Sequence, residues 1–220
     1  MLPLVLDLKI KILINRSSED FITSDHPVAK TNQYSFGILD GGVTGWAVKG
    51  LQVFVPISPR HTIMFYDEKI YKVGTRRSDE VFVAQNSDVD ALNTLQLLNA
   101  HENVYFRDKS QGQHIAELFT SCYHRRRKDK VRTRFFNITD GTGALIKGRH
   151  TYKENVVFRE SLSFCKVQTA KKQIPPERRE FGLRQPELVA VHKQFQKEVD
   201  AGKYKREDWL KFLDELKTRR

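Results

Sequence analysis

The residues best suited to chemistry lie in one short segment, Phe21–Pro27, which reads Phe-Ile-Thr-Ser-Asp-His-Pro. Asp25 could ligate a metal ion or act as a general base, and His26 could move a proton near neutral pH. Thr23 and Ser24 add hydroxyl groups to the same candidate binding site. Small polar residues in this order also form turns in which their side chains bond the local backbone. Both interpretations stay open.

Other polar residues could join Asp25 in one site. Asp67 and Glu68 follow a predicted strand, and a cluster of carboxylates suits a hard divalent cation. Asn93 and Gln96 lie one helical step apart and could face the same place. A solvated turn and a polar helix face are the simpler interpretations. The sequence leaves open whether the chain is an enzyme, and a metal-dependent hydrolase or nuclease centred on Asp25 and Asp67 is one hypothesis.

The strongest chemical signal is a basic segment, Arg125–Arg134, with seven cations and one acid in ten residues. Its cations are Arg125, Arg126, Arg127, Lys128, Lys130, Arg132 and Arg134. Arginine forks bind phosphate oxygens, and the adjacent Tyr123, Phe135 and Phe136 could stack on bases. A net charge of +11 over 220 residues also favours an anionic partner. We predict binding to nucleic acid or another polyanion, with a solvated loop or an acidic protein surface as the alternatives.

Several function classes find no support in the sequence. It contains no GxSxG nucleophile elbow and no glycine-rich phosphate loop. Cys122 and Cys165 have no metal-type spacing, so we predict reduced thiols in a cytoplasmic protein. No cofactor is predicted apart from a divalent metal ion at Asp25. No apolar run approaches the roughly 18 residues of a membrane span, so no membrane partner is expected.

Hydrophobic periodicity predicts an α+β core domain over residues 1–168. Alternation over residues 4–14 predicts a half-buried strand whose apolar face includes Ile10 and Ile12, with residues 21–24 as its antiparallel hairpin partner. Further strands are predicted at 50–56, 61–66, 70–73 and 81–84, and helices at 88–100 and 112–124. The mainly antiparallel sheet over 4–84 continues near 135–167, and the helices pack on one face. Asn93 and Gln96 are expected near the edge of the buried helix face.

The composition changes at residue 169, where a proline-containing linker begins. Residues 169–220 are therefore predicted to form a linker and a C-terminal helical appendage. Its two amphipathic helices, at 186–199 and 206–217, carry apolar stripes that include Trp209 and Phe212. Such stripes are typical of internal packing, and docking on a protein partner through 186–217 is a third functional hypothesis.

Residues 8–106 contain a Thr-Ser-Asp-x-Pro-Val box, a Gly-Leu-Gln-Val-Phe-Val-Pro segment from Gly50, and an Asp-Ala-Leu-Asn-Thr-Leu-Gln segment from Asp90. In order and spacing, this part of the chain resembles a bacterial family of uncharacterised proteins known only as a domain of unknown function. The His-Tyr-Val-Pro opening typical of that family is absent here. The resemblance implies an accessory or defence-associated bacterial protein and no particular reaction.

Overall fold

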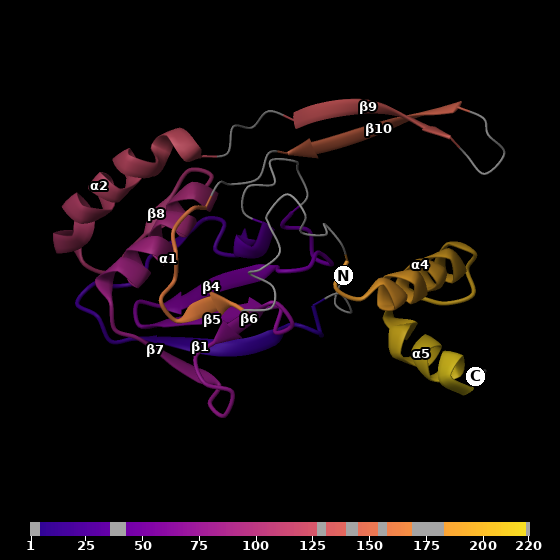
Figure 1. Cartoon of the computed structure of the whole chain (residues 1–220), viewed down its shortest axis with the longest axis horizontal. Helices are drawn as coiled ribbons and strands as arrows, with labels where there is room; N and C mark the ends of the chain where they lie inside the picture. The colour runs from indigo at the N-terminus through magenta and orange to yellow at the C-terminus, as the bar shows by residue number, and fades with distance from the viewer. Residues whose placement is uncertain are drawn as a thin grey trace.

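The computed structural model of the chain describes residues 5–35, 43–126, 131–139, 145–153, 158–168 and 183–218, with backbone alone for 131–139 and 145–153. Its centre is a five-stranded sheet in the order β3-β4-β5-β1-β7 (Figure 1). These strands are β1 (Lys9–Asn15), β3 (Ala29–Thr31), β4 (Gln52–Ser58), β5 (His61–Tyr66) and β7 (Glu80–Val83). All pairs are antiparallel except β1 with β7. The predicted α+β class with a mainly antiparallel sheet is confirmed.

Six further strands form three two-stranded pairs. They are β2 (Thr23–Ser24) with β8 (Val104–Tyr105), β6 (Tyr71–Val73) with β11 (Cys165–Val167), and β9 (Val131–Thr139) with β10 (Leu145–Lys153). The predicted hairpin between residues 4–14 and 21–24 is wrong, because β1 pairs with β5 and β7 while β2 pairs with β8.

The core lies between the sheet and α1 (Asn86–Asn99), whose Val89, Leu92 and Leu95 pack against Leu13 and other buried side chains of the sheet. α2 (Gly112–Cys122) packs on α1 through a second apolar cluster. Short 3₁₀ turns are η2 (Gln33–Ser35), η3 (Lys109–Gln111), η4 (Tyr123–Arg125) and η6 (Arg206–Asp208). Val89, Leu92 and Leu95 thus form the core face of α1.

Strand β1 presents the opposite face from the one expected. Lys11 and Leu13 are 1% and 0% exposed, whereas Ile10 and Ile12 are 49% and 38% exposed. The apolar alternation of β1 identified the strand but assigned the wrong face to the core. The reason is that Lys11 finds hydrogen-bond partners in the loop between β6 and β7, which an alternation rule cannot detect.

Two amides of α1 hold the segment that contains β2. Asn93 donates to the carbonyl of Asp20 (2.9 Å) and accepts from the amide of Ile22 (3.0 Å). Gln96 accepts from the Ser24 hydroxyl (3.0 Å) and donates to the carbonyl of Pro27 (3.0 Å). Asn93 and Gln96 are buried and not at the helix edge, because they bond backbone groups on either side of β2.

The C-terminal helices α4 (Pro186–Asp200) and α5 (Trp209–Thr218) lie beside the core (Figure 1). Phe195, Tyr204 and Phe212 form the centre of their own apolar cluster. Just before α4, Arg184 binds the carboxylate of Asp7 through two bonds of 2.9 and 3.0 Å. Among the described helices, none combines the length and apolar character that a membrane crossing needs.

Replacing Asn93 by leucine should destabilise the fold. The change leaves the Asp20 carbonyl and the Ile22 amide buried without partners, which costs about 2–4 kcal/mol of unfolding free energy. Urea unfolding measures it. Asn99→Leu on the same helix is the matched control, since Asn99 is partly exposed and water can replace its bonds. Equal losses of unfolding free energy in Asn93→Leu and Asn99→Leu would contradict the role given to the Asn93 hydrogen bonds.

Candidate anion-binding pocket

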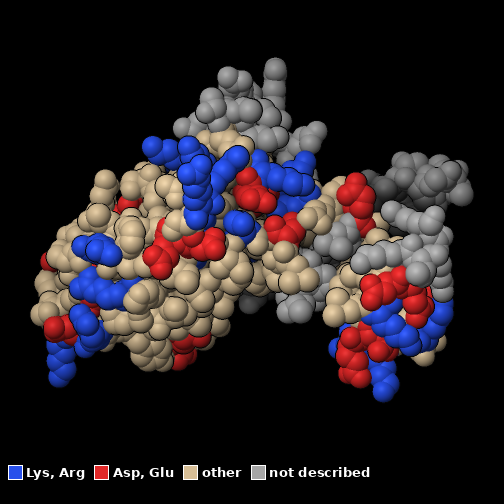
Figure 2. All heavy atoms as spheres, turned by 90° about the horizontal axis from the view of Figure 1, so that it is seen from below, with Lys and Arg blue, Asp and Glu red and all other residues tan. Residues whose placement is uncertain are grey.

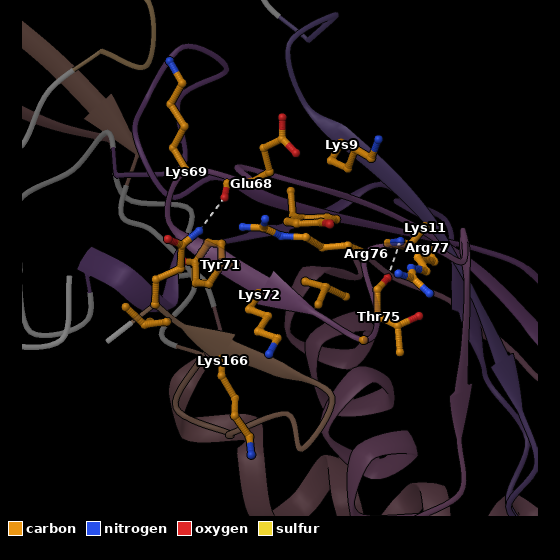
Figure 3. A pocket seen from close by; sticks show the side chains of 15 residues that line it. Lys9, Lys11, Glu68, Lys69, Tyr71, Lys72, Thr75, Arg76, Arg77 and Lys166 are labelled. Carbon is orange, nitrogen blue, oxygen red and sulfur yellow. Dashed lines mark hydrogen bonds between the residues drawn. The ribbon is translucent and has the colours of Figure 1, made fainter. Parts of the chain in front are cut away.

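A pocket with a volume of about 1150 Å³ gathers positive charge beside β6 (Figure 3). Six exposed side chains on its lining are cations: Lys9, Lys69, Lys72, Arg76, Arg77 and Lys166. The buried Lys11 adds a seventh. Among the described residues that line this pocket, Glu68 is the one carboxylate. This set of residues is called the cationic pocket below.

Different elements bring these cations together. Lys9 and Lys11 lie on the same face of β1, because side chains alternate along a strand. Lys72 of β6 and Lys166 of β11 are direct cross-strand partners in the antiparallel pair. Lys69 lies in the turn that leads into β6. The β6–β11 pair thus brings Lys166, which is distant in the sequence, into the cationic pocket.

The loop after β6 presents Arg76 and Arg77. Gly74 has a φ of +51°, and a Cβ atom there would lie 2.8 Å from Val81 Cγ2, so the turn requires glycine. The Lys11 ammonium then donates to the carbonyls of Thr75 (3.1 Å) and Ser78. Figure 3 shows the side chain of Arg76 extending across the pocket from this loop.

The ammonium of Lys11 also lies 3.8 Å from a carboxylate oxygen of Asp79 at the end of the same loop. Its donors are thus directed to three groups of one loop, which is how a buried ammonium is normally compensated. Lys11 therefore acts mainly as the anchor of the arginine-bearing loop.

The six exposed cations of the cationic pocket have no carboxylate partner among the described residues. Within the described part of the chain, none of its six exposed cations forms an ion pair. By contrast, residues 186–217 carry seven cations and seven acids, and Figure 2 shows both kinds interspersed on the C-terminal helices. Positive charges clustered in a concave site attract anions.

Tyr66, at the end of β5, also lines the pocket and is 5% exposed. Burial raises the pKa of its phenol, and the negative charges of Glu68 and Asp79 add to the effect. The hydroxyl therefore keeps its proton at neutral pH and can donate a hydrogen bond to an anion.

Asp25 stabilises the loop that follows α1. Its carboxylate accepts hydrogen bonds from the amides of His101 (2.8 Å), Glu102 (2.7 Å) and Asn103 (3.1 Å). Partial desolvation works to raise the pKa of Asp25, but these amide donors and the nearby His26 outweigh it and lower the pKa to about 2. The geometry is that of a backbone cap.

Asp67 has an equivalent role elsewhere in the fold. It is buried, and its carboxylate accepts from the amides of Gly50 (2.9 Å) and Lys69 (3.1 Å). Asp25 and Asp67 thus bind separate loops, and the described residues contain no group of three or more His, Cys, Asp or Glu that could hold a metal ion. Asp67 also lines a smaller cavity of about 350 Å³, which shares Lys9, Glu68 and Lys69 with the cationic pocket.

The remaining residues of the predicted Asp25 site lie on β2 and α1. Thr23 is half-buried and pairs with Tyr105, and Ser24 donates to Gln96. Asn93 bonds the backbone on either side of Phe21. The structure therefore brings Ser24, Asn93 and Gln96 into one buried network, whose described hydrogen bonds hold local structure.

Two residues of the predicted basic segment are engaged within the fold. Arg125 binds Glu160 at 2.6 Å, and Arg126 donates to the carbonyls of Ala100 (2.7 Å) and His101 (2.9 Å). Arg132 and Arg134 lie on β9, whose backbone pairs with β10. The other predicted binding residues, Arg127, Lys128 and Lys130, lie outside the described residues.

The cationic pocket was not predicted from the sequence. Its cations are spread from Lys9 to Lys166, and only the adjacent Arg76 and Arg77 form a pair within the sequence. The one usable signal was Lys9 and Lys11 within an otherwise apolar strand, where lysine is rarely placed without a partner.

Comparison with known proteins identifies one family. The family described as "protein of unknown function (DUF4238)" matches residues 1–110. The matched part includes six of the seven pocket cations and excludes Lys166. No curated protein and no solved structure matches the chain.

Replacing Lys11 by methionine should destabilise the protein by about 1–3 kcal/mol, because the carbonyls of Thr75 and Ser78 lose their donor. The free energy of unfolding in urea measures the change. Lys9→Met, two residues away on the exposed rim, should change it by less than about 0.5 kcal/mol. A Lys11→Met variant as stable as the wild type would show that the ammonium does not anchor the loop.

Asp25 should contribute stability that depends on pH in a defined direction. Its folded-state pKa is lowered from 3.8 to about 2, so the contribution is complete above 3.8 and is lost as pH falls through 2. The difference in unfolding free energy between wild type and Asp25→Asn should therefore be constant above about pH 5 and shrink toward pH 2. Unfolding measured across this range tests it, and a pH-independent difference would contradict the cap.

Proposed function

We propose that this chain, which belongs to the protein family of unknown function DUF4238, binds nucleic acid or another phosphate-bearing polyanion through the cationic pocket. The observation that supports the proposal is the set of six exposed cations around one cavity, none with an ion pair in the described residues. Exposed cations usually alternate with acids on protein surfaces, as they do on α4 and α5. The excess of cations over the one carboxylate of the described pocket lining, Glu68, favours an anionic ligand.

The chemistry of the pocket fits phosphate better than carboxylate ligands alone. Four exposed lysines supply compact charges, and Arg76 and Arg77 supply planar forks that bind phosphate oxygens in pairs. A polyanion can occupy many cations at once, whereas a single carboxylate would leave most of them unpaired. We also propose that the basic segment Arg125–Arg134 contributes to binding the same class of ligand through Arg127, Lys128, Lys130, Arg132 and Arg134.

The other hypotheses gain less support. Asp25 and Asp67 bind different loops, so no observation favours the metal-dependent hydrolase. Described apolar side chains of residues 186–217, including Phe195 and Phe212, pack between α4 and α5, and docking on a protein partner through this segment stays a prediction. A cytoplasmic location and a role in bacterial defence also stay predictions.

Removing pocket cations should weaken nucleic-acid binding and its salt dependence together. Each phosphate contact contributes about 0.7–0.9 to the slope of log affinity against log salt, so Arg76→Gln with Arg77→Gln should lower the slope by about 1.4–1.8. Fluorescence anisotropy of a labelled oligonucleotide between about 50 and 200 mM salt measures this.

Lys193→Gln with Lys197→Gln on α4 is the matched control and should leave the slope unchanged. An affinity that is indifferent to ionic strength would overturn the proposed function. If the Arg76→Gln, Arg77→Gln variant kept the wild-type slope of log affinity against log salt, nucleic acid would bind outside the cationic pocket.

A further inference from the structure

We infer that the cationic pocket admits a single strand of nucleic acid and holds one of its phosphates between Lys72 and Lys166. This inference rests on the proposed function and names the ligand form and the residues that grip it. It follows from the arrangement of the pocket cations and from the register of two strands, and one phenol adds a further donor.

The cations surround a cavity and do not form a stripe. They come from β1, the turn before β6, β6 itself, the following loop and β11, and Figure 3 shows them on several sides of the pocket. A duplex is a stiff rod that contacts charges along a surface or accepts an inserted protein element into its groove. A single strand is narrow and flexible enough to enter a cavity that encloses it.

Lys72 and Lys166 are placed to share one anion. They are direct partners across the β6–β11 pair, so their Cβ atoms lie about 4.5–5.5 Å apart. Both are exposed, and Figure 3 shows both side chains extending to the same side. Like charges directly opposite one another destabilise a strand pair. A phosphate that accepts from both ammonium groups removes this repulsion.

Tyr66 offers a further hydrogen-bond donor to a ligand in the pocket. It lines the pocket, is 5% exposed, and its hydroxyl forms no hydrogen bond with any described residue. Its oxygen is not one of the described side-chain atoms that are buried without a hydrogen-bond partner, so a ligand in the pocket can reach it. A phosphate or base entering the pocket would accept a hydrogen bond from this hydroxyl.

The test is a double-mutant cycle in the full-length chain. The probe is a labelled oligothymidylate of about twelve nucleotides, compared with a duplex of the same length at one salt concentration. We expect the single strand to bind at least about tenfold more tightly than the duplex. Lys72→Gln and Lys166→Gln should each weaken single-strand binding about five- to tenfold, and the double variant should lose little more, because both act on one phosphate.

The free protein gives a second measurement. Either single substitution removes the repulsion within β6–β11, so the urea midpoint of unfolding should rise in both and should not rise in a Lys69→Gln control. A lower midpoint in both lysine variants would overturn the repulsion argument.

The outcomes separate this inference from the proposed function. If neither oligonucleotide binds, the proposed function falls, and this inference falls with it. If duplex and single strand bind equally, or if the losses from Lys72→Gln and Lys166→Gln multiply, the shared-phosphate site is wrong while polyanion binding stands. If inorganic phosphate at the same concentration displaces the oligonucleotide, the pocket is a site for small anions and not for a strand.

Discussion

The buried ammonium of Lys11 is the constraint on which both the sheet and the cationic pocket depend. A charge at 1% exposure must be compensated, and the Thr75–Asp79 loop folds over it to provide two carbonyls and a carboxylate. Because Lys11 faces inward, its neighbours on β1 face outward, which exposes Ile10 and Ile12. The hydrogen bonds of Lys11 also fix the position of the loop that carries Arg76 and Arg77. One side chain thus determines a strand face and the position of two pocket arginines.

A second set of polar side chains replaces secondary structure around β2. Asn93 and Gln96 bond the backbone of residues 20–27, and Asp25 binds the amides after α1. The Thr-Ser-Asp segment and the helix segment that begins at Asp90 thus contact one another, through Ser24 and Gln96. Asp25, whose residue type suggests acid–base chemistry, here accepts hydrogen bonds from exposed backbone amides, while the two amide side chains satisfy buried backbone groups. A Thr-Ser-Asp sequence alone does not separate these roles.

The positions of strands and helices were predicted from the sequence better than the faces they bury and the strands they pair with. β5 begins and ends where the 61–66 prediction placed it, and α2 ends within two residues of its predicted limit. These segments have strong local periodicity, so local rules suffice. The faces of β1, the partner of β2 and the meeting of Lys72 with Lys166 depend on long-range pairing. Periodicity carries no information about which distant strand supplies a partner, so the pocket could not be assembled from the sequence.

The pair formed by Arg184 and Asp7 joins regions from opposite ends of the sequence. Arg184 is 8% exposed and also donates to the carbonyl of Val48 at 3.0 Å, so its guanidinium is largely buried. The helical pair α4–α5 is therefore attached to the first strand region by a charge-assisted contact as well as by the chain. Removing the first seven residues would remove the Asp7 carboxylate that Arg184 binds. Shortened forms made for crystallisation should therefore keep Asp7.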